Sequence, residues 1–193
     1  NETFLKLLNE GRAIFPVFDF ENSERSEETK LIELEARDVI IVEGLHALNP
    51  LLTETVDARN IFKLYVSTRT QFMYKDVVVL SPKDNRLIRR MVRDHKFRGR
   101  PPKDTLEAWE SVLDGEEKNV YTFRDSADIK IDSAHNYEGC IFHHYILPMV
   151  QELKSDAKYG GKIREVVEIL EAFDDIDFKY IPKDSLLREF IGF

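Results

Sequence analysis

Short apolar runs alternate along this chain with longer stretches in which apolar residues recur every three or four positions. The short runs are typical of β-strands. The clearest is the β-branched run from Asp38 to Gly44, which predicts a strand buried on both faces of a parallel sheet. Further extended segments are predicted at residues 13–20, 30–35, 61–67 and 127–132. The longer stretches predict helices at residues 85–96, 105–120 and 136–153, with Asp104 as the N-cap of the second and Pro148 breaking the third.

Strands that alternate with helices of this length predict an α/β protein, in which helices flank a parallel sheet. The length of 193 residues suits one such domain with a small addition. Gly160-Gly161 is the clearest linker, so we expect a main domain over residues 1–158 and a helical C-terminal appendage over residues 159–193. The appendage has an apolar helical stripe that can pack on the main domain, formed by Ile163, Val166, Val167, Leu170 and Phe173. A last short helix, capped by Asp184 or Ser185, is predicted through Phe190.

Composition narrows the class of protein further. No apolar run approaches the ~20 residues that cross a membrane, and no secretory signal segment opens the chain. The single Cys140 excludes an internal disulfide and a cysteine-based zinc site, which fits a reducing cytoplasm. The net charge of −8 argues against general nucleic-acid binding. We therefore expect a cytoplasmic protein with small-molecule partners, and a homo-oligomer is compatible with the sequence.

The stretch from Arg86 to Arg100 departs from this acidic background, because it carries seven of the chain's 28 lysine and arginine side chains. In a helix, its first arginines fall within an arc of about 100°. These are Arg86, Arg89, Arg90 and Arg93, opposite an apolar side made of Leu87, Ile88, Met91 and Val92. Gly99 is predicted to end the helix, which leaves Arg98 and Arg100 on a mobile turn.

Several guanidinium groups that converge in this way can bind phosphate oxygens bidentately, so the stretch predicts a phosphate site in a cleft. The alternative is a solvated helix face with ion pairs between neighbouring turns. That alternative is weaker, because Asp94 is the only acid in the stretch and the arginines would mostly repel one another.

Glu43-Gly44 is the second informative feature. Ligands of open α/β sheets bind beyond the carboxyl ends of the strands, and an acid placed there can hold Mg²⁺ directly or through water. Taken alone, an acid at the end of a strand is more often a simple turn residue. Together with the basic stretch it indicates phosphoryl transfer, because Mg²⁺ and arginines are the usual groups that neutralise a transferring phosphoryl group.

Four segments resemble the later two-thirds of the uridine kinase/phosphoribulokinase family of P-loop kinases. They are Pro16 to Phe20 followed by Arg25, Val39 to Leu48, Arg86 to Arg100, and Ser126 to Asp128. The resemblance implies a P-loop NTPase-like kinase fold that lacks its first strands and its P-loop in this chain. The ending from Ile181 to Gly192 resembles a bacterial branch in which the kinase domain follows domains similar to the TGS module of threonyl-tRNA synthetase.

The resemblance also implies an activity: ATP-dependent phosphorylation, with Mg²⁺, of a hydroxyl on a uridine- or cytidine-like nucleoside or on a sugar phosphate. Carried over by motif, Glu43 is the acid at the metal site, and Glu43, Arg93 and Arg98 are the catalytic candidates. Phosphate contacts fall to Arg90 and Arg93, and Arg98 and Arg100 lie on the lid over ATP. The acceptor pocket is bordered by Phe18, Phe20 and Arg25.

Two departures limit what this chain can do alone. The Gly-x-x-x-x-Gly-Lys-Ser/Thr loop that cradles ATP phosphates is absent, since Gly161-Lys162 is followed by Ile163. The family's general base follows an early strand that is also absent, so we expect no kinase activity from this chain by itself. Uridine kinases also place a histidine and a glutamine where this chain has Ser23 and Glu107, which leaves the acceptor open.

Two other functions are compatible with the same residues. One is a non-catalytic nucleotide- or phosphate-binding module, or an RNA-associated regulatory module, which the acceptor-site departures and the TGS-like ending favour. The other is a structural domain with a basic surface.

Overall fold

The computed structural model describes residues 2–19 and 24–192. The chain divides into two compact units, residues 1–65 with 116–129 and residues 66–115 with 130–193, and each is described by itself. The division between a main domain at residues 1–158 and an appendage at 159–193 stays a prediction.

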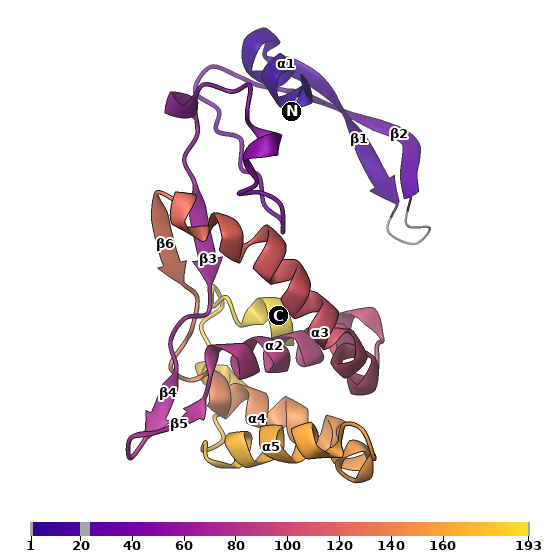
Figure 1. Cartoon of the computed structure of the whole chain (residues 1–193), viewed down its shortest axis with the longest axis vertical. Helices are drawn as coiled ribbons and strands as arrows, with labels where there is room; N and C mark the ends of the chain where they lie inside the picture. Colours follow the sequence, from indigo (N-terminus) through magenta and orange to yellow (C-terminus); the bar gives the residue numbers. More distant parts are fainter. Residues whose placement is uncertain (1, 20–23, 193) are drawn as a thin grey trace. The chain divides into compact units, whose positions relative to one another are not determined.

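The first unit begins with a helix and a hairpin. Helix α1 (Glu2–Glu10) leads through Gly11, which has a φ of 72°, into strand β1 (Arg12–Asp19). Strand β1 pairs in antiparallel fashion with β2 (Glu24–Glu33), as Figure 1 shows. Leu7 and Ala13 are buried, and the rings of Phe4 and Phe15 meet edge to face at 5.7 Å. These apolar contacts hold α1 against the hairpin.

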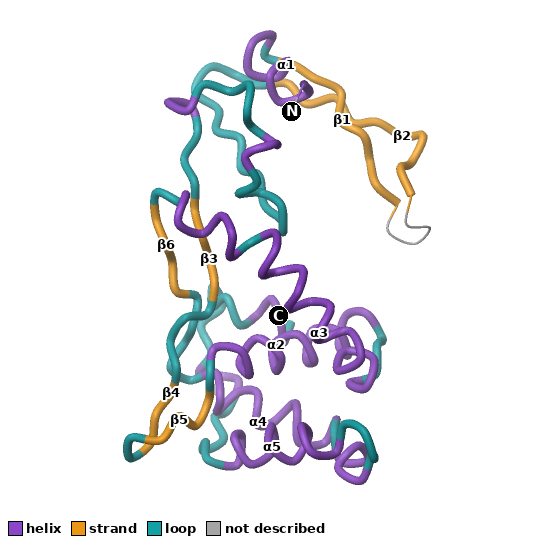
Figure 2. Tube along the Cα trace, viewed as in Figure 1, coloured by secondary structure: helices purple, strands orange, loops and turns teal. Residues whose placement is uncertain are grey.

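The segment from Asp38 to Gly44 is not a strand, so the prediction of a buried central strand is wrong for this chain. It forms a loop, within a region that contains only the short 3₁₀ turns η1 (Pro50–Leu52) and η2 (Ala58–Asn60) (Figure 2). Val39 is 83% exposed and Ile41 is 87% exposed. A β-branched run becomes a strand only when neighbouring strands supply backbone partners, and no described strand pairs with this one.

Two other predicted strands are present and form a parallel pair. Strand β3 (Leu64–Ser67) pairs with β6 (Ile129–Asp132). The carbonyl of Lys63 accepts from the amide of Ile129, and that of Ser67 accepts from the amide of Ser133. The residue numbers of the bonded partners therefore increase in the same direction along both strands, as in a parallel pair. The prediction that these are core strands is wrong, because Tyr65 is buried but every residue of β6 is exposed. The predicted α/β class, with a parallel sheet and helices, is confirmed.

In the second unit a small hairpin precedes the helices. Strands β4 (Phe72–Tyr74) and β5 (Val77–Leu80) are antiparallel and are joined by Lys75 and Asp76. These two residues have positive φ values of 48° and 65°, as the tight twisted turns of two-residue hairpins require.

Five helices enclose the core of the second unit. They are α2 (Pro82–Arg98), α3 (Pro102–Asn119), α4 (Glu138–Met149), α5 (Gly160–Glu171) and α6 (Arg188–Ile191). Helix α4 packs between α2 and α5 (Figure 1). The 3₁₀ turns η4 (Gln151–Ser155) and η5 (Phe178–Tyr180) lie in this unit, whereas η3 (Tyr121–Ser126) belongs to the first unit. The apolar side predicted for α2 lies in the core, since Leu87, Ile88, Met91 and Val92 have no exposed surface.

Several helix boundaries differ from the predictions. Helix α3 already begins at Pro102, because proline is tolerated in a first turn, so Asp104 lies inside the helix and is not its N-cap. The cap predicted for the last short helix at Asp184 or Ser185 is wrong, because the N-cap of α6 is Leu187. The predicted break at Pro148 is confirmed, since α4 ends at Met149 and the 3₁₀ turn η4 follows it. Gly160-Gly161 is not a linker but opens α5, where a Cβ on Gly160 would lie 2.7 Å from the carbonyl oxygen of Lys154.

Helix α2 is fixed at both ends. Ser81 caps its N-terminus by accepting from the amide of Asp84, and Gly99 ends it in the left-handed conformation at a φ of 61°. Burial raises the pKa of Asp84, but hydrogen bonds from Lys162 of α5 and from Ser81 outweigh it, so the pKa lies below its ordinary value. The predicted end of the helix at Gly99 is confirmed.

The two helical glycines Gly139 and Gly161 test how closely the core is packed. A Cβ on Gly139 would lie 2.5 Å from the ring of Phe173, whereas a Cβ on Gly161 would meet nothing within 4 Å. We expect Gly139→Ala to lower the free energy of unfolding by about 1–3 kcal/mol through overpacking. The matched control Gly161→Ala should change it by less than about 1 kcal/mol, towards higher stability. Urea denaturation followed by circular dichroism measures both, and equal effects would contradict this packing.

Candidate functional site

Arg89 is a structural residue and not part of an open basic face. Its guanidinium group donates to both carboxylate oxygens of Glu138 on α4, at 2.6 Å and 2.5 Å, and also to Ser133. The exposed fractions of the Arg89 and Glu138 side chains are 8% and 0%. The prediction that all four arginines of the arc face a cleft is therefore wrong for Arg89, whose charge is neutralised inside the protein.

Asp94 forms ion pairs with two further arginines of α2, Arg90 and Arg98. Its carboxylate is buried and accepts a 2.7 Å hydrogen bond from Arg98, while the guanidinium of Arg90 lies 3.3 Å away. The hydroxyl of Thr105, the fourth residue of α3, donates to the same carboxylate. The main-chain carbonyl of Asp94 accepts from the amides of Gly99 and Arg100. One acid thus connects α2, the turn that follows it and the start of α3.

Arg93 lies on the outer side of this group and meets the end of the chain. Its Nη1 atom is 3.2 Å from the carboxylate of Glu189, and its guanidinium lies over the ring of Phe190, 5.7 Å from the centroid. Repulsion among the arginines is present, because, besides burial, the charges of Arg93, Arg98 and Arg100 all lower the pKa of Arg90, but it is partly offset. The acids that offset their charge come from α4 and α6 as well as from α2 itself.

Some donor capacity of this cluster remains unused. The Nε–H group of Arg93 is buried and has no hydrogen-bond acceptor in the part of the chain that the structure describes, whereas the Nε atom of Arg90 lies 3.3 Å from the carboxylate of Asp94. Burial lowers the pKa of the Arg90 guanidinium. The charge of Asp94 opposes that effect, and the nearby positive charges of Arg93, Arg98 and Arg100 add to it. We call Arg90, Arg93, Arg98 and Arg100 the arginine cluster. Its members lie close enough to repel one another, and an anion would relieve that repulsion.

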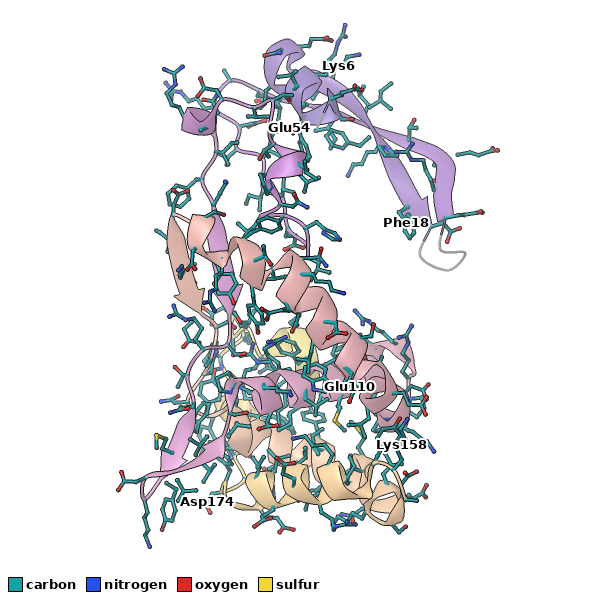
Figure 3. All side chains as sticks on the ribbon, in the orientation of Figure 1. Lys6, Phe18, Glu54, Glu110, Lys158 and Asp174 are labelled. Atoms are coloured by element: carbon teal, nitrogen blue, oxygen red, sulfur yellow. The ribbon has the colours of Figure 1, made fainter. Side chains whose placement is uncertain are left out.

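The predicted acceptor residues lie on the hairpin of the first unit. Phe18 on β1 and Arg25 on β2 are direct cross-strand partners, so the structure brings these two together. Phe18 is half exposed and lies near the end of the hairpin (Figure 3). Phe20, the third predicted residue, lies outside the described residues. The roles of all three stay predictions.

Glu43 lies in the exposed loop that replaces the predicted strand. Gly44 after it has a φ of 145°, a conformation that favours glycine, which agrees with the predicted sharp turn at this point. Mg²⁺ in phosphoryl-transfer sites keeps several waters and uses one or two carboxylates besides the phosphates, and Glu43 is a donor of that type. Among the described residues no group of three or more His, Cys, Asp or Glu could hold a metal ion. The metal role of Glu43 stays a prediction.

Comparison with known proteins places the chain in a family. The sequence model of the Phosphoribulokinase / Uridine kinase family matches residues 1–138. The chain belongs to this family. It is 38% identical over 111 residues to a uridine kinase of Staphylococcus haemolyticus, an alignment that covers 56% of this chain and 44% of the relative. No solved structure matches it.

Other curated members of the family are similar to the same degree. A uridine kinase of Bacillus pumilus is 39% identical over 99 residues, with 51% of this chain and 38% of the relative covered. A uridine kinase of Macrococcus caseolyticus is 36% identical, with 56% and 45% covered. These alignments span less than half of each relative. In the part of the chain that the structure describes, no helix has both the length and the apolar character needed to cross a membrane.

Sequence reasoning missed the pairing of the arginines of α2 with three acids. The spacing of four residues from Asp94 to both Arg90 and Arg98 is the signal for ion pairs within a helix. No local pattern points to Glu138 or Glu189, because each is far along the chain from its arginine.

Replacing Asp94 should loosen the cluster. We expect Asp94→Asn to lower the free energy of unfolding by about 1–3 kcal/mol, because Arg98 and Thr105 lose a charged acceptor. Asp114→Asn is the matched control, since Asp114 is exposed on α3 and its replacement should have little effect. Urea denaturation of both variants measures the difference. Equal stabilities would contradict the role given to Asp94.

Proposed function

We propose that this chain forms the phosphate-gripping and acceptor-holding part of an ATP-dependent phosphotransferase. The acceptor would be a hydroxyl on a uridine- or cytidine-like nucleoside or on a sugar phosphate. The observation that carries the proposal is the arginine cluster around Asp94, in which the buried Nε–H donor of Arg93 lacks an acceptor among the described residues. Membership of the Phosphoribulokinase / Uridine kinase family supports it.

The division of the cluster between a helix and a turn suits phosphoryl transfer. Arg90 and Arg93 are held by α2, whose opposite side is buried in the core, so their guanidinium groups start from a fixed position. Arg98 is the last residue of α2 and pairs with Asp94, so the prediction that it lies on the turn is wrong, whereas Arg100 follows Gly99, where the helix ends. Donors held by the helix would position the phosphates, and Arg100 on the turn would close over them. Preorganised charge of this kind accounts for most of the catalysis in phosphoryl transfer.

Mg²⁺ bound through Glu43 would neutralise the charge that develops on the phosphates. The acceptor would lie against the hairpin, where the exposed ring of Phe18 offers an apolar surface and Arg25 opposite it offers a charged donor. The relatives named uridine kinase support a nucleoside as the acceptor.

The absence of a Gly-Lys-Ser/Thr sequence gives the first test. We expect this chain alone to turn over no ATP with any nucleoside or sugar phosphate, because it has no cradle for the ATP phosphates. The longer protein that contains it should phosphorylate at least one acceptor in the same screen. Turnover by the isolated chain would contradict the first expectation. Nucleotide binding without turnover in the longer protein would favour the non-catalytic regulatory module.

Arg93 gives the second test. In the longer protein, Arg93→Met keeps the apolar stem over Phe190 but removes the charge, and we expect kcat to fall about 100-fold or more. Lys83→Met is the matched control, since it removes a positive charge from the exposed first turn of the same helix and should leave kcat within about two-fold. Thermal unfolding of both variants shows that folding is retained. Unchanged kcat in Arg93→Met would count against the assignment.

A further inference from the structure

The end of the chain contacts the basic side of α2. The family model matches residues 1–138, so α6 lies outside the matched residues. Three successive residues of α6 nevertheless meet α2. Glu189 pairs with Arg93, the ring of Phe190 lies beneath the guanidinium groups of Arg89 and Arg93, and Lys96 donates to the carbonyl of Ile191.

These contacts differ in how firmly they are held. Phe190 and Ile191 are buried, and Phe190 also meets the ring of Phe142 on α4, so α6 is anchored in the core. The side chain of Glu189 is 52% exposed. It can therefore turn away from α2 without moving the helix that carries it.

The pair between Arg93 and Glu189 is a weak one by comparison with its neighbour on α2. Arg89 makes two short hydrogen bonds to a fully buried carboxylate. Arg93 makes one contact of 3.2 Å to an exposed carboxylate, and its Nε–H group is left without an acceptor among the described residues. Exposed ion pairs of this kind contribute little, because water and salt screen both charges.

We propose that Glu189 is a built-in competitor for anions at Arg93. Its carboxylate occupies the position on the guanidinium that a phosphate oxygen would take, so an incoming phosphate must displace it. Glu189 also lines an open groove of about 530 Å³ together with Phe97, Lys183 and Arg188, which gives an anion a path from solvent to this carboxylate. The inference rests on the proposed function, because it assigns Arg93 to phosphate.

The competition acts through charge and follows a simple rule. When no phosphate is bound, Glu189 offsets the charge of Arg93, which otherwise faces Arg90 within the same cluster. When phosphate binds, the carboxylate and the phosphate are like charges at one guanidinium, and the monovalent, exposed carboxylate is the one that leaves. Phe190 keeps the guanidinium in place throughout. Removal of the negative charge of Glu189 should therefore strengthen anion binding.

The test uses inorganic tripolyphosphate and this chain, with dissociation constants measured by titration calorimetry at low salt. We expect Glu189→Gln to bind about two- to five-fold more tightly than the unaltered chain, the range that corresponds to an exposed ion pair. Glu168→Gln is the matched control, because it makes the same change at an exposed position on α5 that does not line the groove. This control should bind tripolyphosphate as the unaltered chain does.

A second pair of variants shows whether the effect passes through Arg93. Glu189→Gln should give no gain when Arg93 is already methionine. Equal or weaker binding by Glu189→Gln, an equal gain in Glu168→Gln, or no binding by any variant would each overturn the proposal. The proposed function fails separately, if the longer protein shows no turnover in the acceptor screen while Glu189→Gln still tightens tripolyphosphate binding.

Discussion

The buried carboxylate of Asp94 is the constraint on which the candidate site depends. A carboxylate with 1% of its side chain exposed is stable only when positive charge and hydrogen-bond donors surround it. Arg90, Arg98 and Thr105 meet that requirement, and in doing so they fix the relation between α2, the turn at Gly99 and the start of α3. The contacts that stabilise the buried carboxylate are therefore also the contacts that arrange the arginine cluster.

The basic side of α2 separates into parts with different uses. Arg89 belongs to the core, because Glu138 neutralises its charge and accepts hydrogen bonds from two of its N–H groups. Arg93 retains a donor without an acceptor among the described residues, Arg90 pairs through its Nε atom with Asp94, and Arg98 is the last residue of the helix. A run of arginines in a sequence thus does not predict that every arginine in it binds a ligand. The partners supplied by distant segments decide which guanidinium groups remain available to a ligand.

Local patterns predicted what local forces determine. The apolar side of α2 and its end at Gly99 follow from helical periodicity and from the left-handed conformation that glycine tolerates, and both are present. The ion pairs of Arg89 and Arg93 could not be predicted, because Glu138 and Glu189 lie far along the chain. The strand predicted at residues 38–44 is absent for a related reason. A central strand forms only when neighbouring strands supply backbone hydrogen-bond partners, whatever its own residues favour.

The exposed loop at residues 38–44 has a consequence for the study of Glu43. Val39 to Val42 form a short β-branched segment in which Val39, Ile41 and Val42 are exposed and which pairs with no described strand, and such a segment can pair with the same segment of another molecule. Asp38 and Glu43 bound it with negative charge, which opposes self-association. A variant of Glu43 would weaken this protection whether or not the residue binds Mg²⁺. Loss of activity in such a variant is informative only when the protein is shown to remain unaggregated.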